Sequence, residues 1–134
     1  MADAESQFCQ SVASAFVDAY YQKFDNPSTR PELVDLYTAE AKLTFEGTQT
    51  VGQVAIREKL GTIPLGRIQR AVTVVDSQVI PGLGVLIQVI GQLQNEQDKA
   101  LGFSHSFILK SMNNSFFIDN EIFRLALYNF PDSA

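Results

Sequence analysis

The chain has 134 residues, 46% of them hydrophobic, and a formal net charge of −5 at pH 7, which predicts a single globular domain over residues 1–134. Its 10 basic residues are scattered, which argues against nucleic acid or an anionic membrane as a partner, because both require clustered Lys and Arg. One cysteine allows no intrachain disulfide, and the acidic start without a long apolar run predicts a protein of the cytoplasm, the nucleus or both.

A long amphipathic helix is predicted from Ser6 to about Phe24, because apolar residues recur there at helical spacing. Asp25–Ser28 should end it, since Pro27 disfavours helical geometry at the preceding residue. The residues expected on the buried stripe are Phe8, Val12, Ala13, Phe16, Ala19, Tyr20 and Phe24.

Two shorter helices and one short strand are expected next. Thr29 and Glu32 have the spacing of a capping box, which predicts a helix through about Tyr37. Leu43–Glu46 alternates in polarity before Gly47-Thr48, which indicates a short strand and a turn. A helix is predicted between Gly52 and Gly61, with these residues pointing inward: Val54, Ile56 and Leu60.

The second half of the chain is rich in Val, Ile and Phe, which favours long strands. Turn-forming residues separate them and predict successive antiparallel hairpins. The expected strands are Ile68–Val79, Leu83–Leu93, Leu101–Met112 and Phe116–Leu127, with turns at Pro81-Gly82, Gln94–Lys99 and Asn113-Asn114. Helices followed by strands predict an α+β fold, with the N-terminal helices packed on one face of a bent antiparallel sheet.

One of these strands is apolar on both faces. Val85–Ile90 is interrupted only by Gln88, whereas an antiparallel strand covered on one side should alternate apolar and polar residues. The second face therefore favours packing against another copy of the same sheet in a homodimer. The alternative is that the chain's own ends cover it.

No catalytic or metal-binding constellation is evident in the sequence. The single His and single Cys lie far apart, and Gly82-Leu83-Gly84 is better explained as a turn than as a phosphate loop. His105 is in step with Phe103 and Phe107, which predicts a packed, hydrogen-bonded histidine. No metal and no cofactor are expected, and the protein is predicted not to be an enzyme.

Three acidic residues stand near predicted strand ends. Glu96 and Asp98 are two residues apart and would point to the same side of an extended backbone, and Glu46 directly follows Phe45. If the sheet curls around the helices, they could flank an apolar cavity. On spacing alone, solvated loop carboxylates remain the simpler explanation.

Six motifs occur in register between about Ser6 and Phe130. They are Phe16–Asp25 (FVDAYYQKFD), Leu43–Gly47 (LTFEG), Ile56–Pro64 (IREKLGTIP), Gly91–Leu93, Gly102-Phe103 and Ile122–Phe130 (IFRLALYNF). Together these motifs resemble those of the nuclear transport factor 2 family. The resemblance implies a cone-like roll of the cystatin-like or nuclear transport factor 2-like type, and a homodimer formed sheet to sheet. It also implies a carrier that binds the GDP-bound small GTPase Ran and returns it to the nucleus.

The resemblance assigns a Ran-binding site to residues of this chain. In the family, an apolar cavity receives an aromatic side chain of Ran, and acids around it pair with basic residues of Ran. The corresponding acids are Glu46, Glu96 and Asp98. The corresponding cavity residues are Phe45, Ile63, Leu65, Ile68 and Phe123, of which Ile63, Leu65 and Ile68 could equally be ordinary core.

Family members also bind phenylalanine-glycine repeats of nucleoporins, which implies a location at the nuclear pore. One of their repeat-binding positions is an aromatic near the N-terminus. Here Cys9 stands in that register and Phe8 precedes it, so Phe8 is the candidate substitute.

Two other functions are compatible with this fold. The roll also houses small-molecule isomerases and dehydratases, which use acids, Tyr or His inside the cone. The interior positions that can be named from the sequence are apolar, which argues against this alternative. An adaptor domain within a longer chain is the third possibility.

Overall fold

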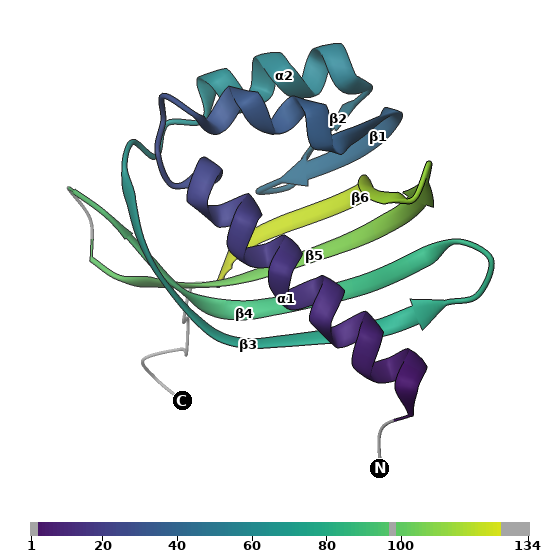
Figure 1. The fold of residues 1–134 in the computed structure, drawn as a ribbon. Coiled ribbons are helices and arrows are strands. Elements are labelled where there is room, and N and C mark those ends of the chain that lie inside the picture. Colours follow the sequence, from purple (N-terminus) through teal and green to yellow (C-terminus); the bar gives the residue numbers. More distant parts are fainter. Residues whose placement is uncertain (1–2, 97–98, 127–134) are drawn as a thin grey trace, which may run out of the picture.

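The computed structural model describes residues 3–96 and 99–126 and shows two helical segments at one end of a bent sheet that a long helix crosses (Figure 1). The elements in chain order are α1 (Ala4–Phe24), η1 (Arg30–Leu36), β1 (Tyr37–Phe45), β2 (Thr48–Val51), α2 (Gln53–Thr62), β3 (Ile68–Ile80), β4 (Gly84–Asn95), β5 (Leu101–Met112) and β6 (Ser115–Ala126). The predicted α+β roll is confirmed.

Helix α1 begins at a side-chain cap and buries one face. The Asp3 carboxylate accepts a hydrogen bond from the Ser6 N–H at 2.7 Å, which satisfies one of the free donors at the helix start. The buried residues are Cys9, Ala13, Val17, Tyr20, Tyr21 and Phe24. The stripe is therefore rotated from the predicted one, and Phe8 and Ala19 are exposed instead. None of the described helices has the length and apolar character of a membrane span.

The predicted capping box at the second helix is wrong. The Thr29 hydroxyl donates to the Lys23 carbonyl at 2.7 Å and makes no cap hydrogen bond. The Glu32 carboxylate lies 3.0 Å from Lys23 Nζ, so it is engaged by α1 rather than by the start of its own segment. The segment is a short 3₁₀ helix, and the chain turns into strand at Tyr37.

The six strands form one sheet in the order β2-β1-β6-β5-β4-β3. Strand β1 begins earlier than the predicted Leu43, and β2 occupies residues expected to follow a turn. The two Asn residues of the β5–β6 turn have φ angles of 51° and 63°, which suits a tight hairpin and confirms that turn.

The expectation of a purely antiparallel sheet is wrong at one pair. Strand β1 runs parallel to β6, with Phe45 opposite Phe123, whereas β3, β4, β5 and β6 form the predicted antiparallel hairpins. The chain between β1 and β6 contains α2 and the three long strands, so the pairing joins the two ends of the fold. Nothing in either local sequence specifies that direction.

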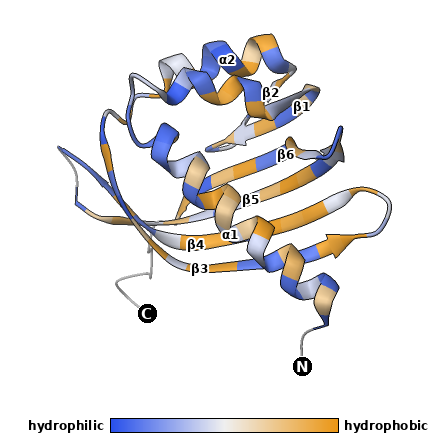
Figure 2. Ribbon diagram, in the orientation of Figure 1, coloured by the Kyte–Doolittle hydropathy of each residue, from blue (hydrophilic) through white to orange (hydrophobic). Residues whose placement is uncertain are grey.

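Helix α1 crosses the concave face of the sheet, while η1 and α2 lie over the β1–β2 end (Figures 1 and 2). The concave face carries the core, which includes Val85, Ile87 and Val89 of β4. In α2, Ile56 and Leu60 are buried as predicted, but Val54 is 80% exposed, so that prediction is wrong.

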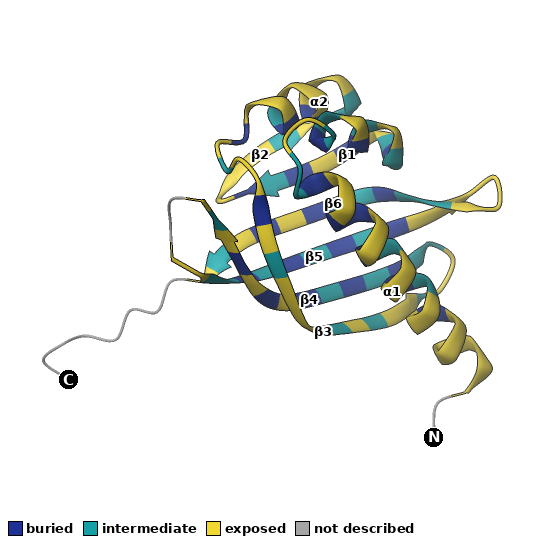
Figure 3. Cartoon of the chain, turned by 60° about the vertical axis from the view of Figure 1, so that its left-hand side comes forward, coloured by how far each residue is buried: buried dark blue, intermediate teal, exposed yellow. Residues whose placement is uncertain are grey.

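The opposite, convex face of the sheet keeps apolar side chains at the surface. Ile90 and Ile122 are 40% and 56% exposed, and Val74, opposite Ile90, is 41% exposed. Between them, Gln88 bonds Ser104 and Ser106 through hydrogen bonds of 2.8 and 2.6 Å. The alternation of buried and half-buried residues along β4 and β5 is visible in Figure 3.

Two glycines provide a matched test of this packing. A Cβ at Gly91 would lie 2.3 Å from the Ala71 carbonyl oxygen and 3.0 Å from the Phe103 ring, whereas one at Gly61 in α2 would meet nothing within 4 Å. We expect Gly91→Ala to lower the free energy of unfolding by about 1–3 kcal/mol, and Gly61→Ala to raise it by about 0.5–1 kcal/mol. Urea denaturation measures both, and equal effects would contradict the close approach at Gly91.

Candidate functional site

The predicted site residues gather at one end of the sheet. Strand β1 ends at Phe45 and is parallel to β6, where Phe123 is its partner. Strand β4 ends at Asn95, which pairs with Ile68 at the start of β3. The sheet register therefore brings Glu46 and Glu96, which follow β1 and β4, to the same end. Asp98 lies outside the described residues.

Glu46 is held in place by the end of β6. Its backbone has a φ of 51°, and its N–H donates to the Phe123 carbonyl at 3.0 Å. Its side-chain Oε1 accepts a hydrogen bond from the Leu125 N–H at 2.6 Å. The carboxylate is exposed but not free to rotate, so its charge has a defined position at the sheet end.

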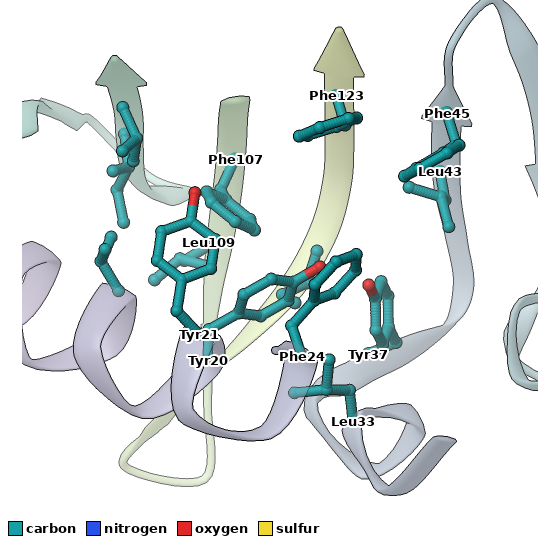
Figure 4. Close-up of a cluster of buried hydrophobic side chains, with 14 of the residues drawn as sticks. Tyr20, Tyr21, Phe24, Leu33, Tyr37, Leu43, Phe45, Phe107, Leu109 and Phe123 are labelled. Carbon is teal, nitrogen blue, oxygen red and sulfur yellow. The ribbon is translucent and has the colours of Figure 1, made fainter. Parts of the chain in front are cut away.

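Two phenylalanines stack on each other at this end of the sheet. The rings of Phe45 and Phe123 are 4.8 Å apart with an interplanar angle of 12°, and Figure 4 shows them side by side on β1 and β6. Lys59 Nζ lies 5.4 Å from the Phe45 ring centroid, a distance that suits a cation–π contact.

The five predicted cavity residues differ in burial. Ile63 and Ile68 are each 6% exposed, Phe45 is 9% exposed and Phe123 is 1% exposed, so these four belong to the core. Leu65 is half-buried and packs against that core. Leu65 also lines a pocket at this end of the sheet.

A pocket of about 180 Å³ lies between the loop before β3 and the end of β4. Its lining includes the predicted site residues Leu65 and Glu96, together with Arg67 and Asn95. A neighbouring hollow of about 390 Å³ shares Arg67, Asn95 and Glu96. Arg67 was not singled out in the sequence, where a basic residue in a loop carries no distinguishing signal.

Arg30 holds the loop that carries Leu65, and sequence reasoning missed it. The residue is 1% exposed. Its guanidinium donates to the carbonyls of Phe24, Ile63 and Gly66 at 2.7, 3.3 and 2.6 Å. These bonds tie the ends of α1 and α2 to the loop on both sides of Leu65. Burial lowers the pKa of Arg30 from its ordinary value.

The interior also contains a buried acid, Glu121, that the sequence analysis did not single out. His105 is buried and hydrogen-bonded, which confirms its prediction as a packed histidine, but it bonds a buried carboxylate, Glu121. Glu121 also accepts hydrogen bonds from the hydroxyls of Tyr20 and Tyr37. Its only signal in the sequence is an acid two residues before Phe123, on the same face of an apolar strand.

Burial dominates the protonation of this cluster. Burial lowers the pKa of His105, although the hydrogen bond to Glu121 acts in the opposite direction. Burial also raises the pKa values of Tyr20 and Tyr37 well above their ordinary range. His105 is therefore neutral at pH 7 and both hydroxyls keep their protons. Among the described residues, no group of His, Cys, Asp and Glu could hold a metal ion.

A helix lying on a strongly bent sheet, with a pocket at one sheet end, defines a nuclear transport factor 2-like, cystatin-like roll. The "Nuclear transport factor 2 (NTF2) domain" profile matches residues 12–125. The chain belongs to the nuclear transport factor 2 family.

Similar proteins come from distant eukaryotes. A "Probable nuclear transport factor 2" of Caenorhabditis elegans is 45% identical over 90% of this chain and 94% of that protein. A rice protein named nuclear transport factor 2 (Oryza sativa subsp. japonica) is 41% identical over 86% of this chain and 94% of its own length. The structure of nuclear transport factor 2 from Cryptosporidium parvum superposes with a TM-score of 0.81 at 36% identity, covering 87% of this chain and 94% of that one. These relatives are named as transport factors rather than as enzymes.

The buried cluster predicts a specific pH dependence of stability. As the pH falls through 6.5, the ordinary pKa of histidine, unfolded His105 takes up a proton while folded His105 stays neutral. The unfolded state then binds more protons, so the free energy of unfolding falls. Above pH 10.0, the ordinary tyrosine value, the unfolded state loses protons that the folded state keeps, and stability falls again.

The His105→Gln variant tests the loss of stability at low pH. The Gln amide does not titrate, and the carboxylates of the protein stay the same. Urea unfolding from about pH 7.5 down to about pH 5.5 should show a smaller loss of stability for the variant than for the wild type. Parallel pH curves would show that His105 has the same pKa in the folded and unfolded states.

Proposed function

We propose that this protein is a nuclear import carrier that binds GDP-bound Ran at the end of the sheet where β1 and β4 finish. The observation that carries the proposal is that Glu46, next to the Phe45–Phe123 stack, and Glu96, in one pocket with Leu65, lie at the same end of the sheet in a chain of the nuclear transport factor 2 family. The Glu46 carboxylate is positioned by Leu125, and Glu96 and Leu65 line one pocket.

The chemistry of this sheet end suits a partner with an aromatic residue flanked by basic ones. Burial of one aromatic side chain supplies about 2–3 kcal/mol of binding free energy. The exposed carboxylates contribute less to affinity, but they set the orientation and the salt dependence of association. Selectivity for GDP-bound Ran follows if Ran presents that aromatic only in the GDP state.

Nucleoporin repeats are proposed to dock near the start of α1. Phe8 is 63% exposed there, whereas Cys9 is 2% exposed and packs in the core. Phe8 is therefore the residue that can offer an aromatic contact, and Cys9 is not supported in that role. Docking at this place would let the carrier work between the cytoplasm, the nuclear pore and the nucleus.

The protein is also proposed to act as a homodimer through the convex face of its sheet. Ile90, Ile122 and Val74 expose apolar surface there, and the Gln88 amide bonds two serines within the same face. A second copy would cover this surface symmetrically. The face lies opposite the concave side that α1 covers, so a dimer leaves both sheet-end sites accessible.

A catalytic role has one observation in its favour, the buried cluster of His105, Glu121 and tyrosines. The side chains of His105 and Glu121 are each 1% exposed, and their ring nitrogens and carboxylate oxygens are all hydrogen-bonded within the protein. A general acid or base must reach its substrate. The cluster therefore supports a structural role better than catalysis, and the protein is proposed to be a carrier and not an enzyme.

Titration calorimetry against Ran loaded with GDP, and separately with a GTP analogue, tests the carrier proposal. We expect micromolar or tighter binding to the GDP form alone. Glu46→Gln keeps an oxygen for the Leu125 N–H but removes the charge, so it should weaken binding by roughly twofold to fivefold at low salt. Glu40→Gln, at an exposed position on β1, the strand that precedes Glu46, is the matched control. Binding to neither nucleotide form would contradict the proposal.

The homodimer is tested by sedimentation at micromolar concentration. The wild type should sediment at twice the chain mass of 14.8 kDa, and Ile90→Lys should shift it toward the monomer, because a charge would be buried against the partner. Val54→Lys, at an 80% exposed site on α2, should leave the dimer unchanged. A monomeric wild type would overturn this part of the proposal.

A further inference from the structure

A chain of polar groups crosses the core from α1 to β1. The Tyr21 hydroxyl oxygen lies 2.8 Å from His105 Nδ1, and His105 Nε2 lies 2.6 Å from Glu121 Oε2. The Tyr20 hydroxyl donates to the same Glu121 oxygen, and the Tyr37 hydroxyl donates to the other. Four elements, α1, β1, β5 and β6, therefore meet through one carboxylate.

The chemistry of these groups fixes the direction of each hydrogen bond. A carboxylate only accepts, so His105 must donate to Glu121 from Nε2. A neutral imidazole with its proton on Nε2 has Nδ1 free to accept, and the Tyr21 hydroxyl supplies that donor. Both ring nitrogens are thus engaged, which defines the tautomer and the orientation of the ring.

Tyr21 is itself held from the far side. The Arg70 guanidinium lies 3.7 Å from the Tyr21 ring centroid, and Asp25 holds Arg70 at 2.6 Å. The charged and titratable groups that face His105 are therefore Tyr20 and Tyr21 of α1, Glu121 of β6 and Arg70 of β3, with Asp25 behind Arg70.

His105 also begins a row of rings that ends at the candidate site. Its cross-strand partner on β6 is Phe123, whose partner on β1 is Phe45. The His105 and Phe123 rings are 5.2 Å apart at 81°, and Phe123 stacks on Phe45. Phe45 directly precedes Glu46, so two ring contacts connect the imidazole to the sheet end.

We propose that His105 is a positioning residue for the partner-binding end of the sheet. Its hydrogen bonds to Tyr21 and Glu121 hold the imidazole at a fixed angle to Phe123, and Phe123 in turn sets Phe45 beside Glu46. This inference rests on the proposed binding of Ran–GDP at that end. It assigns a role in binding to a residue that touches no partner.

Two single-atom deletions separate positioning from general stability. Tyr21→Phe removes the hydrogen bond to His105 Nδ1, whereas Tyr20→Phe removes one donor to Glu121 and leaves both His105 bonds in place. Each deletes one buried hydroxyl, so both should lower stability. Only Tyr21→Phe should weaken Ran–GDP binding at a temperature where both variants are folded, by roughly threefold to tenfold.

The single histidine of the chain provides a readout that needs no partner. Long-range ¹H–¹⁵N correlation spectra at about pH 7 should show a neutral ring protonated on Nε2 in the wild type and in Tyr20→Phe. The Nδ1 resonance should shift in Tyr21→Phe, because its hydrogen bond is lost.

The outcomes that overturn the inference are distinct from failure of the proposed function. Equal weakening of Ran binding by the two variants, no weakening by Tyr21→Phe, or a wild-type ring protonated on Nδ1 would each exclude the positioning role while leaving the carrier function intact. A wild type that binds no Ran–GDP would overturn the carrier function and the positioning role together, and the histidine spectra would still report the tautomer.

Discussion

The fold depends on how one buried carboxylate is satisfied. Glu121 is 2% exposed, and an unpaired carboxylate in such a place would cost several kcal/mol. Its donors come from three other elements, Tyr20 of α1, Tyr37 of β1 and His105 of β5. The carboxylate is satisfied only when these elements stand in their native positions around β6, so the polar cluster specifies the arrangement that apolar packing alone would leave less defined.

The same strand links that cluster to the sheet end. Phe123 follows Glu121 on the concave face of β6 and stacks on Phe45 of β1, and the Leu125 N–H holds the Glu46 carboxylate. Arg30 holds the loop that carries Leu65, because its guanidinium donates to carbonyls on both sides of that residue. Rigid support from both sides would reduce the conformational entropy that the proposed binding site loses when a partner docks.

The sequence predicted what depends on local pattern. Helix α1, the long strands and the hairpin turns follow from periodicity and turn chemistry. The start of β1 was missed because four of the five residues of Thr38–Lys42 are Ala, Glu or Lys, which are depleted in strands. The parallel β1–β6 pair and the buried Glu121 were missed because both depend on contacts between residues far apart in the chain. Of the candidate site, the motifs named Glu46, Glu96 and Leu65, but they did not point to Arg30 and Arg67, which lie next to Leu65 in the structure.

A buried polar cluster in this roll invites comparison with catalysis, and its geometry argues for a different use. A catalytic acid or base keeps one position open for its substrate, whereas the oxygens of Glu121 and both nitrogens of His105 are occupied by protein partners. Opening the cluster would break its buried hydrogen bonds, and a carboxylate left without donors while still shielded from water would carry its full desolvation cost. A cluster that resists opening is poorly suited to turnover but well suited to keeping a binding surface in one shape through repeated cycles of capture and release.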